Sequence, residues 1–121
     1  MPVKVAGMEN TELVLHLAGP GTRPFPDLEA ALRTARNARA ELPEAGIELV
    51  VQGPVVARLA GDAAEAAAFA AEEGMTVTAC RNSLRSAGID EATLPAGITV
   101  VPAAVAHLAR RQFGGAAYIR V

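Results

Sequence analysis

Five short apolar runs that alternate with helical segments limit the fold of this chain more than any other feature of its sequence. Each run is bounded by glycine, proline or polar turn residues, and such runs are typical of strands covered on both faces of a sheet. The predicted strands are residues 12–17, 47–52, 75–79, 98–101 and 116–121. Strands that alternate with helices favour right-handed crossovers and a parallel arrangement. The sequence therefore predicts an α/β fold with a mainly parallel five-stranded sheet and helices on both of its faces.

The segments between the strands carry the spacing and the end signals of helices. Asp27 is a suitable N-cap for the first helix, and Gly74 is a suitable C-terminal stop for the third. Helices are predicted from Asp27 to about residue 42 and over residues 55–59, 62–73, 82–88 and 103–112. The last helix is expected to bury Val105 and Leu108. Because no linker or repeat interrupts this order, residues 1–121 are predicted to form a single domain.

The helix predicted over residues 62–73 is almost wholly alanine on one side. At 100° per residue, Phe69 falls among the acidic side chains of the same helix. We therefore expect the alanine side to lie on the sheet and Phe69 to point away from it. His107 is expected to project from the outer side of the last helix, where it either meets solvent or a second subunit. Phe69 and His107 are thus the predicted contacts between subunits.

Composition argues against several classes of partner. The formal net charge is −2, and the chain has three Phe, one Tyr and no Trp. It therefore lacks both the basic face and the stacking aromatic residues of a protein that binds nucleic acid. No apolar segment approaches the ~20 residues that cross a bilayer, and the first residues lack the apolar core of a signal peptide. We expect a cytoplasmic protein with no nucleic-acid and no membrane partner.

The sequence offers little to hold a metal or a nucleotide cofactor. One cysteine and two histidines cannot supply the four nitrogen or sulfur ligands of a structural zinc site. Residues 19–22 (GPGT) follow the first predicted strand, but no Gly-Lys-Ser/Thr ending and no GxGxxG pattern accompanies them. We therefore expect no metal and no cofactor.

The candidate reactive group is Cys80, which directly follows the strand predicted over residues 75–79. Ligands of open parallel sheets bind at the carboxyl ends of strands. Positive charge on Arg81 and the backbone N–H groups near Asn82 and Ser83 are expected to favour the thiolate. This reasoning predicts a partly exposed thiol with a lowered pKa. The alternative is that Cys80 is a buried residue that packs as a small hydrophobe.

Two further polar residues stand in or at the end of neighbouring predicted strands. His16 lies inside the first strand, and Gln52 ends the second, just before Gly53. A strand histidine is usually a hydrogen-bonded residue of the core or of an interface. The other interpretation is that His16, Gln52 and Gly53 line the pocket at Cys80.

Residues 77–85 (VTACRNSLR), followed by Gly88-Ile89-Asp90, resemble the DsrE/DsrF-like family of sulfur-relay proteins. Gly53-Pro54 after the second strand and residues 100–102 (VVP) are similar to that family too. The similarity runs through nearly the whole chain and is densest over residues 74–121. The resemblance implies a three-layer α/β/α sandwich that assembles as a homotrimer or homohexamer.

The same resemblance implies a function. Family members carry sulfane sulfur as a cysteine persulfide, here on Cys80 with Asn82 and Ser83 as turn partners, and exchange it with donor and acceptor proteins. Many members have histidine where this chain has Gln52, which is a departure from the pattern. The rival hypothesis is a homo-oligomeric assembly or small-ligand-binding domain of the same fold, without catalysis, in which Cys80 only packs.

Overall fold

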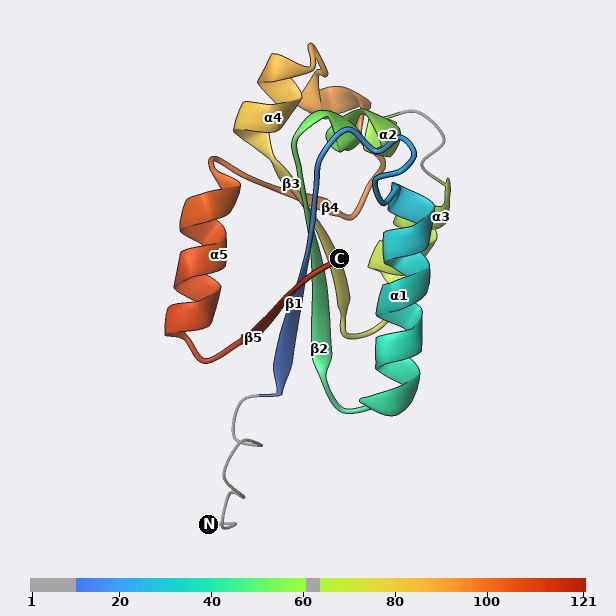
Figure 1. Ribbon diagram of the computed structural model, residues 1–121, viewed down its shortest axis with the longest axis vertical. Coiled ribbons are helices and arrows are strands. Elements are labelled where there is room, and N and C mark those ends of the chain that lie inside the picture. Colours follow the sequence, from blue (N-terminus) through green and yellow to red (C-terminus); the bar gives the residue numbers. More distant parts are fainter. Residues whose placement is uncertain (1–10, 61–63) are drawn as a thin grey trace.

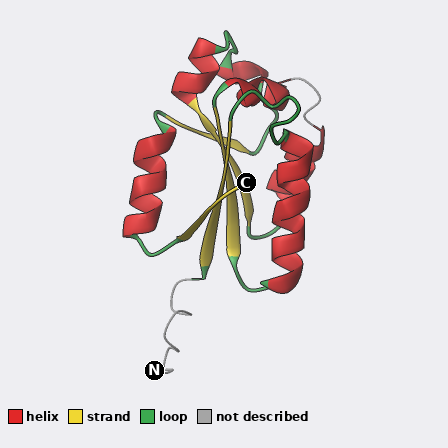
Figure 2. Cartoon of the chain, in the orientation of Figure 1, coloured by secondary structure: helices red, strands yellow, loops and turns green. Residues whose placement is uncertain are grey.

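The computed structural model describes residues 11–60 and 64–121 as a sheet of five parallel strands between two helical layers (Figures 1 and 2). The strands lie in the order β4-β3-β2-β1-β5. They are β1 (Glu12–Ala18), β2 (Gly46–Gln52), β3 (Met75–Cys80), β4 (Ile98–Val101) and β5 (Ala117–Arg120). Helices α1 and α3 cover one face, and α5 covers the other (Figure 1). The predicted α/β fold is confirmed, and each strand lies within one residue of its predicted limits.

The helices also follow their predicted positions, with small differences at their ends. They are α1 (Leu28–Glu41), α2 (Ala57–Ala60), α3 (Ala64–Ala71), α4 (Arg81–Ser86) and α5 (Ala104–Phe113), with short 3-10 turns at Pro54–Val56 and Glu91–Thr93. Asp27 caps α1, since its Oδ1 accepts a hydrogen bond from the Ala30 N–H at 2.8 Å. The predicted helix start at Asp62 lies outside the described residues. Within the described residues, no helix is long and apolar enough to span a membrane.

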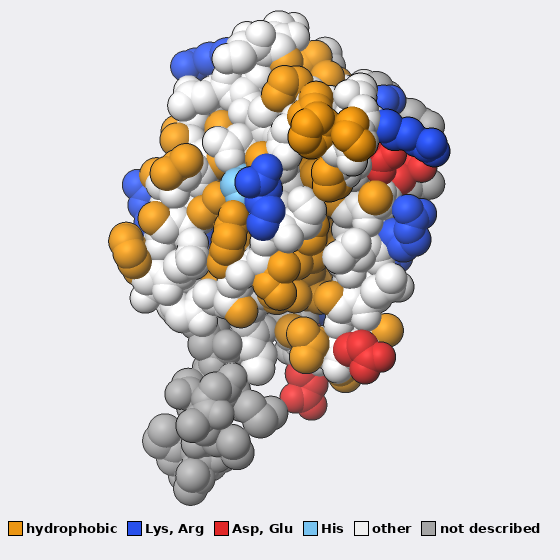
Figure 3. All heavy atoms as spheres, viewed as in Figure 1, with side chains coloured by type: hydrophobic (Ala, Val, Ile, Leu, Met, Phe, Trp, Pro, Cys, Tyr) orange, Lys and Arg blue, Asp and Glu red, His pale blue; other side chains and the backbone are white. Residues whose placement is uncertain are grey.

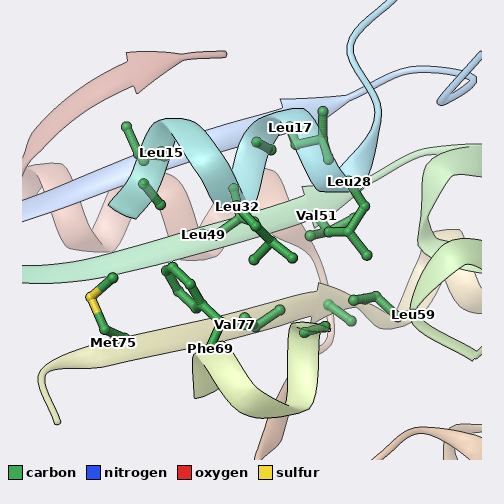
Figure 4. Packing of buried hydrophobic residues seen from close by; sticks show 14 of the residues in the cluster. Leu15, Leu17, Leu28, Leu32, Leu49, Val51, Leu59, Phe69, Met75 and Val77 are labelled. Carbon is green, nitrogen blue, oxygen red and sulfur yellow. The ribbon is translucent and has the colours of Figure 1, made fainter. Parts of the chain in front are cut away.

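The larger hydrophobic core lies between the sheet and the layer of α1 and α3. Phe69 is fully buried there, and its ring lies among Leu32, Leu49 and Val77 (Figure 4). The expectation that Phe69 points away from the sheet is therefore wrong. Burial of a phenylalanine contributes about 1.5–3 kcal/mol, far more than burial of an alanine methyl group. The α3 helix is accordingly rolled so that its aromatic side chain enters the core.

The smaller core lies under α5 and holds the cysteine. Its buried residues are Val14, Val50, Cys80, Ala104, Leu108 and Ala116. Leu108 is buried as expected, but Val105 is 70% exposed, which corrects the prediction for that residue. One helix of ten residues covers this face, so it leaves side chains of the outer strands exposed.

His107 does not project outward as expected, because it faces a buried carboxylate in the sheet. Its Nε2 lies 2.7 Å from Oε2 of Glu48, and Thr78 Oγ1 donates to the same oxygen at 2.5 Å. Arg111 Nε donates to the other oxygen of Glu48 at 3.1 Å. A buried charge is costly unless it is paired and hydrogen-bonded, so Glu48 draws His107 and Arg111 toward the sheet. The bonds of His107 and Arg111 attach α5 to β2, and the bond of Thr78 joins β3 to the same carboxylate.

Candidate functional site

The carboxyl ends of β2 and β3, the start of α4 and the start of α5 border an open-sided cavity of about 380 Å³. Figure 1 shows α4 above the end of β3, on the side of the sheet that α5 covers. The residues that line the cavity include Gln52, Gly53, Cys80, Asn82, Ser83 and Ala104. The structure thus brings together most of the residues that the sequence singled out, from two adjacent strands and the turn after each.

Cys80 is the last residue of β3 and the N-cap of α4. Its side chain borders the cavity, but the residue is only 2% exposed. The expectation of a partly exposed thiol is therefore wrong, because α4 and the start of α5 close over the strand end. The Sγ atom accepts a hydrogen bond from the Ala104 N–H at 3.4 Å. A reagent has to reach this sulfur through the cavity.

The surroundings of the sulfur favour the thiolate. Burial raises the pKa of the Cys80 thiol, but hydrogen bonds from the Ser83 hydroxyl and from the N–H groups of Ser83, Ala104 and Asn82 lower it. The hydrogen bonds outweigh burial, and the pKa lies below its ordinary value. A thiol of this kind is ionised to a greater extent near neutral pH and is a better nucleophile than an ordinary buried cysteine.

Gly53 holds the Ser83 hydroxyl in place. The Gly53 N–H donates to Ser83 Oγ at 2.8 Å, which leaves the hydroxyl proton free to point toward the sulfur. Gly53 has a positive φ of 80°, and a Cβ built there would lie 3.2 Å from the backbone nitrogen of Gly19. Glycine is therefore required at this turn, where the backbone after β2 closely approaches the loop after β1.

Arg81 does not reach the thiol. Its guanidinium pairs with the carboxylate of Glu91, and that hydrogen bond raises the pKa of Arg81. Arg81 does not line the cavity, and it is not among the groups that lower the pKa of Cys80. The predicted electrostatic role of Arg81 is therefore replaced by neutral donors, namely one hydroxyl and three backbone amides.

His16 lies one strand away from the cavity and is linked to it by Gln52. His16 Nε2 lies 2.8 Å from Gln52 Oε1, and His16 Nδ1 lies 2.6 Å from the Tyr118 hydroxyl. Burial lowers the pKa of His16 against the raising effect of the bond to Gln52, and the charge of Arg120 lowers it further. Tyr118 is not among the site residues predicted from the sequence. The sequence feature that could have indicated it is the placement of polar Tyr118 and Arg120 at alternate positions of an otherwise apolar strand, which puts both side chains on one face.

A second polar cluster lies toward the other end of the sheet. It consists of Glu48, Thr78, His107, Arg111 and Glu12, and Arg111 joins the two carboxylates. The sequence feature that could have indicated this cluster is Glu48, a glutamate inside the otherwise apolar run of β2. Among the described residues, no group of three or more His, Cys, Asp or Glu is arranged to hold a metal ion. Since the Glu48 carboxylate is paired on both oxygens, the cluster serves to fasten α5 to the sheet.

Comparison with known proteins places the fold among solved structures. No protein-family model and no curated protein matches the chain. The E. coli protein ychN superposes with a TM-score of 0.71 at 17% identity, over 92% of this chain and 99% of ychN. That likeness concerns the fold alone.

The Methanobacterium thermoautotrophicum protein MTH1491, described as a protein of unknown function, is more similar in sequence. It superposes with a TM-score of 0.74 at 30% identity, over 93% of this chain and 100% of MTH1491. This level of identity over the whole of the other protein is more than a shared architecture. The chain therefore belongs to the same family as MTH1491.

Proposed function

We propose that this protein carries sulfane sulfur as a persulfide on Cys80, as a member of the DsrE/DsrF-like group that its sequence resembles. The observation that carries the proposal is a thiol with a lowered pKa on a cavity of about 380 Å³ at the carboxyl end of a central strand. Ser83, Asn82 and Ala104 supply the donors that stabilise its anion. Thiolate exchange at sulfur requires such an ionised nucleophile.

The proposed reaction is a transfer of one sulfur atom between thiols. The Cys80 thiolate attacks the outer sulfur of a persulfide donor R–S–SH, and a new S–S bond forms as the S–S bond of the donor breaks. The donor leaves as the thiolate R–S⁻ with the electron pair, and Cys80 becomes Cys–S–SH. An acceptor thiolate then removes the outer sulfur in the same way and restores the Cys80 thiolate. No oxidant or reductant is consumed in either step.

The burial of Cys80 limits which donors can react. Because the residue is 2% exposed, the donor sulfur must enter the cavity rather than meet the thiol at the protein surface. A persulfide on a slender arm, such as a low-molecular-weight thiol or the side chain of an extended protein segment, meets this requirement. We propose donor and acceptor proteins that present their sulfur on such an arm.

Intact-mass measurement tests the proposal. The protein is incubated with glutathione persulfide and analysed without reductant, beside Cys80→Ser as the matched control. We expect the wild type to gain one sulfur atom and Cys80→Ser to gain none. Wild-type protein that stays unmodified with glutathione persulfide and with thiosulfate would refute sulfur carriage.

The rival hypothesis is a non-catalytic assembly or small-ligand-binding domain. Its support is that Cys80 belongs to the smaller hydrophobic core, where it contacts α5. Titration with iodoacetamide separates the two hypotheses. Rapid labelling of native protein near neutral pH supports the carrier, and labelling only after unfolding supports the packing role.

We also propose that the protein self-associates as a homotrimer or homohexamer. Phe69 and His107 no longer support it, because both face the interior. Large apolar side chains on α5 and β5 support it instead: Val105, Phe113, Tyr118 and Ile119 are exposed, and Figure 3 shows hydrophobic side chains over these elements. We expect light scattering to find an oligomer at micromolar concentration that Phe113→Glu weakens and Phe25→Glu, at an exposed phenylalanine of the loop before α1, does not. A wild-type monomer would refute this proposal.

A further inference from the structure

A row of polar side chains crosses four adjacent strands and ends at Cys80. Tyr118 on β5 contacts His16 on β1 at 2.6 Å, and His16 contacts Gln52 on β2 at 2.8 Å. Gln52 and Cys80 both line the cavity. Val51 pairs with Ala79 in the sheet, so the next residues, Gln52 and Cys80, are neighbours on strands that lie about 4.8 Å apart.

The side chains of this row lie on one face of the sheet. Val50 and Cys80 both belong to the smaller core under α5. Since side chains alternate between faces along a strand, Gln52 points to the same side as Val50. The order β3-β2-β1-β5 therefore places the cysteine, the glutamine, the histidine and the tyrosine in sequence across one surface.

The hydrogen-bond partners determine where the proton of His16 lies. A neutral imidazole has one donor and one acceptor nitrogen. The partner of Nε2 is the carbonyl oxygen of Gln52, which can only accept, so Nε2 carries the proton. Nδ1 is then the acceptor, and the Tyr118 hydroxyl donates a hydrogen bond to it. Burial and the charge of Arg120 both disfavour the ionised ring, which keeps His16 neutral.

This arrangement sets the orientation of the Gln52 carboxamide. The carboxamide oxygen accepts the hydrogen bond from His16, so the amide nitrogen is the atom that can face the cavity. Among the described residues, this nitrogen has no hydrogen-bond acceptor. The reverse orientation would turn a carbonyl oxygen toward the cavity, where it would repel an anionic sulfur. None of the described residues that line the cavity is charged, so neutral donors decide how an anion is held there.

We infer that His16, held as its Nε2–H tautomer by Tyr118, is a positioning residue that turns the N–H groups of Gln52 toward the outer sulfur of a persulfide on Cys80. The Ser83 hydroxyl and three backbone amides hold the thiolate itself. The outer sulfur of the ionised persulfide extends one S–S bond further into the cavity. A carboxamide does not titrate near neutral pH, so the row orients a donor and does not conduct a proton. This inference rests on the proposed function, because it concerns the group that stabilises the charged sulfur of the persulfide.

Two measurements test the positioning role. Two-bond ¹⁵N–¹H NMR reports the tautomer of His16 directly. We expect the Nε2–H form in the wild type and a mixture of tautomers in Tyr118→Phe, which loses only the hydroxyl. An Nδ1–H form in the wild type would overturn the inference, since the carboxamide would then be reversed.

The second measurement is the pH profile of iodoacetamide labelling of the persulfide on sulfur-loaded Cys80. Gln52→Met keeps the approximate size but removes the donor, and Gln52→Glu replaces it with a carboxylate. Below the pKa of the persulfide, we expect Gln52→Met to react about four-fold more slowly than the wild type and Gln52→Glu more slowly still. Gln112→Glu makes the same exchange at the other glutamine, on α5, and should leave the profile unchanged. Gln52 variants with the wild-type profile would overturn the inference.

Sulfur loading distinguishes this inference from the proposed function. Wild-type protein that takes up no sulfur refutes carriage, and the tautomer of His16 in that protein still tests the orientation of Gln52. Uptake of sulfur by all variants, with an unchanged labelling profile, supports carriage and refutes the positioning role.

Discussion

The Ser83→Ala variant tests how the thiol of Cys80 is activated. The Ser83 hydroxyl accepts from the Gly53 N–H at 2.8 Å and hydrogen-bonds to the sulfur, where it lowers the pKa of Cys80. A hydrogen bond to a charged group contributes about 1.5–3 kcal/mol. Because 1.36 kcal/mol corresponds to a factor of ten in the protonation equilibrium, its loss reduces the thiolate fraction below the pKa by about ten- to hundred-fold.

The rate of alkylation should fall by less than the thiolate fraction. A thiolate of higher pKa is a stronger nucleophile, with a Brønsted coefficient of about 0.4–0.5, and this recovers nearly half of the loss on a logarithmic scale. We therefore expect Ser83→Ala to react with iodoacetamide about four- to fifteen-fold more slowly at a pH below both pKa values. Above both values it should react as fast as the wild type or faster, so the two profiles cross.

The matched control is Ser86→Ala, one turn further along α4. Ser86 borders the same cavity but does not contribute to the pKa of Cys80. We expect its profile to match the wild type. Loss of the Ser83 oxygen also leaves the Gly53 N–H without its acceptor, at a cost of about 1–3 kcal/mol of stability, so folding is checked by circular dichroism. A folded Ser83→Ala protein with an unshifted profile would refute activation by Ser83.

Two further predictions concern stability. Phe69→Ala should lower the free energy of unfolding in urea by about 3–5 kcal/mol, because it empties a fully buried site. Phe25→Ala, at a 56% exposed position of the loop before α1, should change it by less than about 0.5 kcal/mol. Equal effects would contradict the rolled position of α3. Because the folded state lowers the pKa of His16, the unfolded chain binds its proton first as the pH falls through 6.5, so stability should decline below that pH. His16→Asn should flatten this decline in urea titrations at a series of pH values, and a wild-type stability that rises on acidification to pH 5 would contradict the burial of a neutral histidine.

Local patterns in the sequence were sufficient to predict the architecture. Strand and helix limits follow from short apolar runs, helical spacing and end signals such as Asp27 and Gly74, which act within a few residues of the chain. The alternation of strands and helices then leaves a parallel sheet as the favoured arrangement. The placement of Cys80 at a strand end followed from the same rules, because the end of an apolar run is itself a local feature.

Only the tertiary structure decided which way the side chains face and which of them meet. The roll of α3 depends on competition between one phenylalanine and several alanines for the same core space, which the helical period alone does not weigh. The partners of His16 are 36 and 102 residues away in the chain, and they meet it only because the strand order places β5, β1 and β2 side by side. Arg81 is next to Cys80 in sequence, yet Glu91 holds its charge away from the sulfur, and a hydroxyl and backbone amides take its place. Strand order and helix packing are properties of the whole chain, and they determined the chemistry of the site.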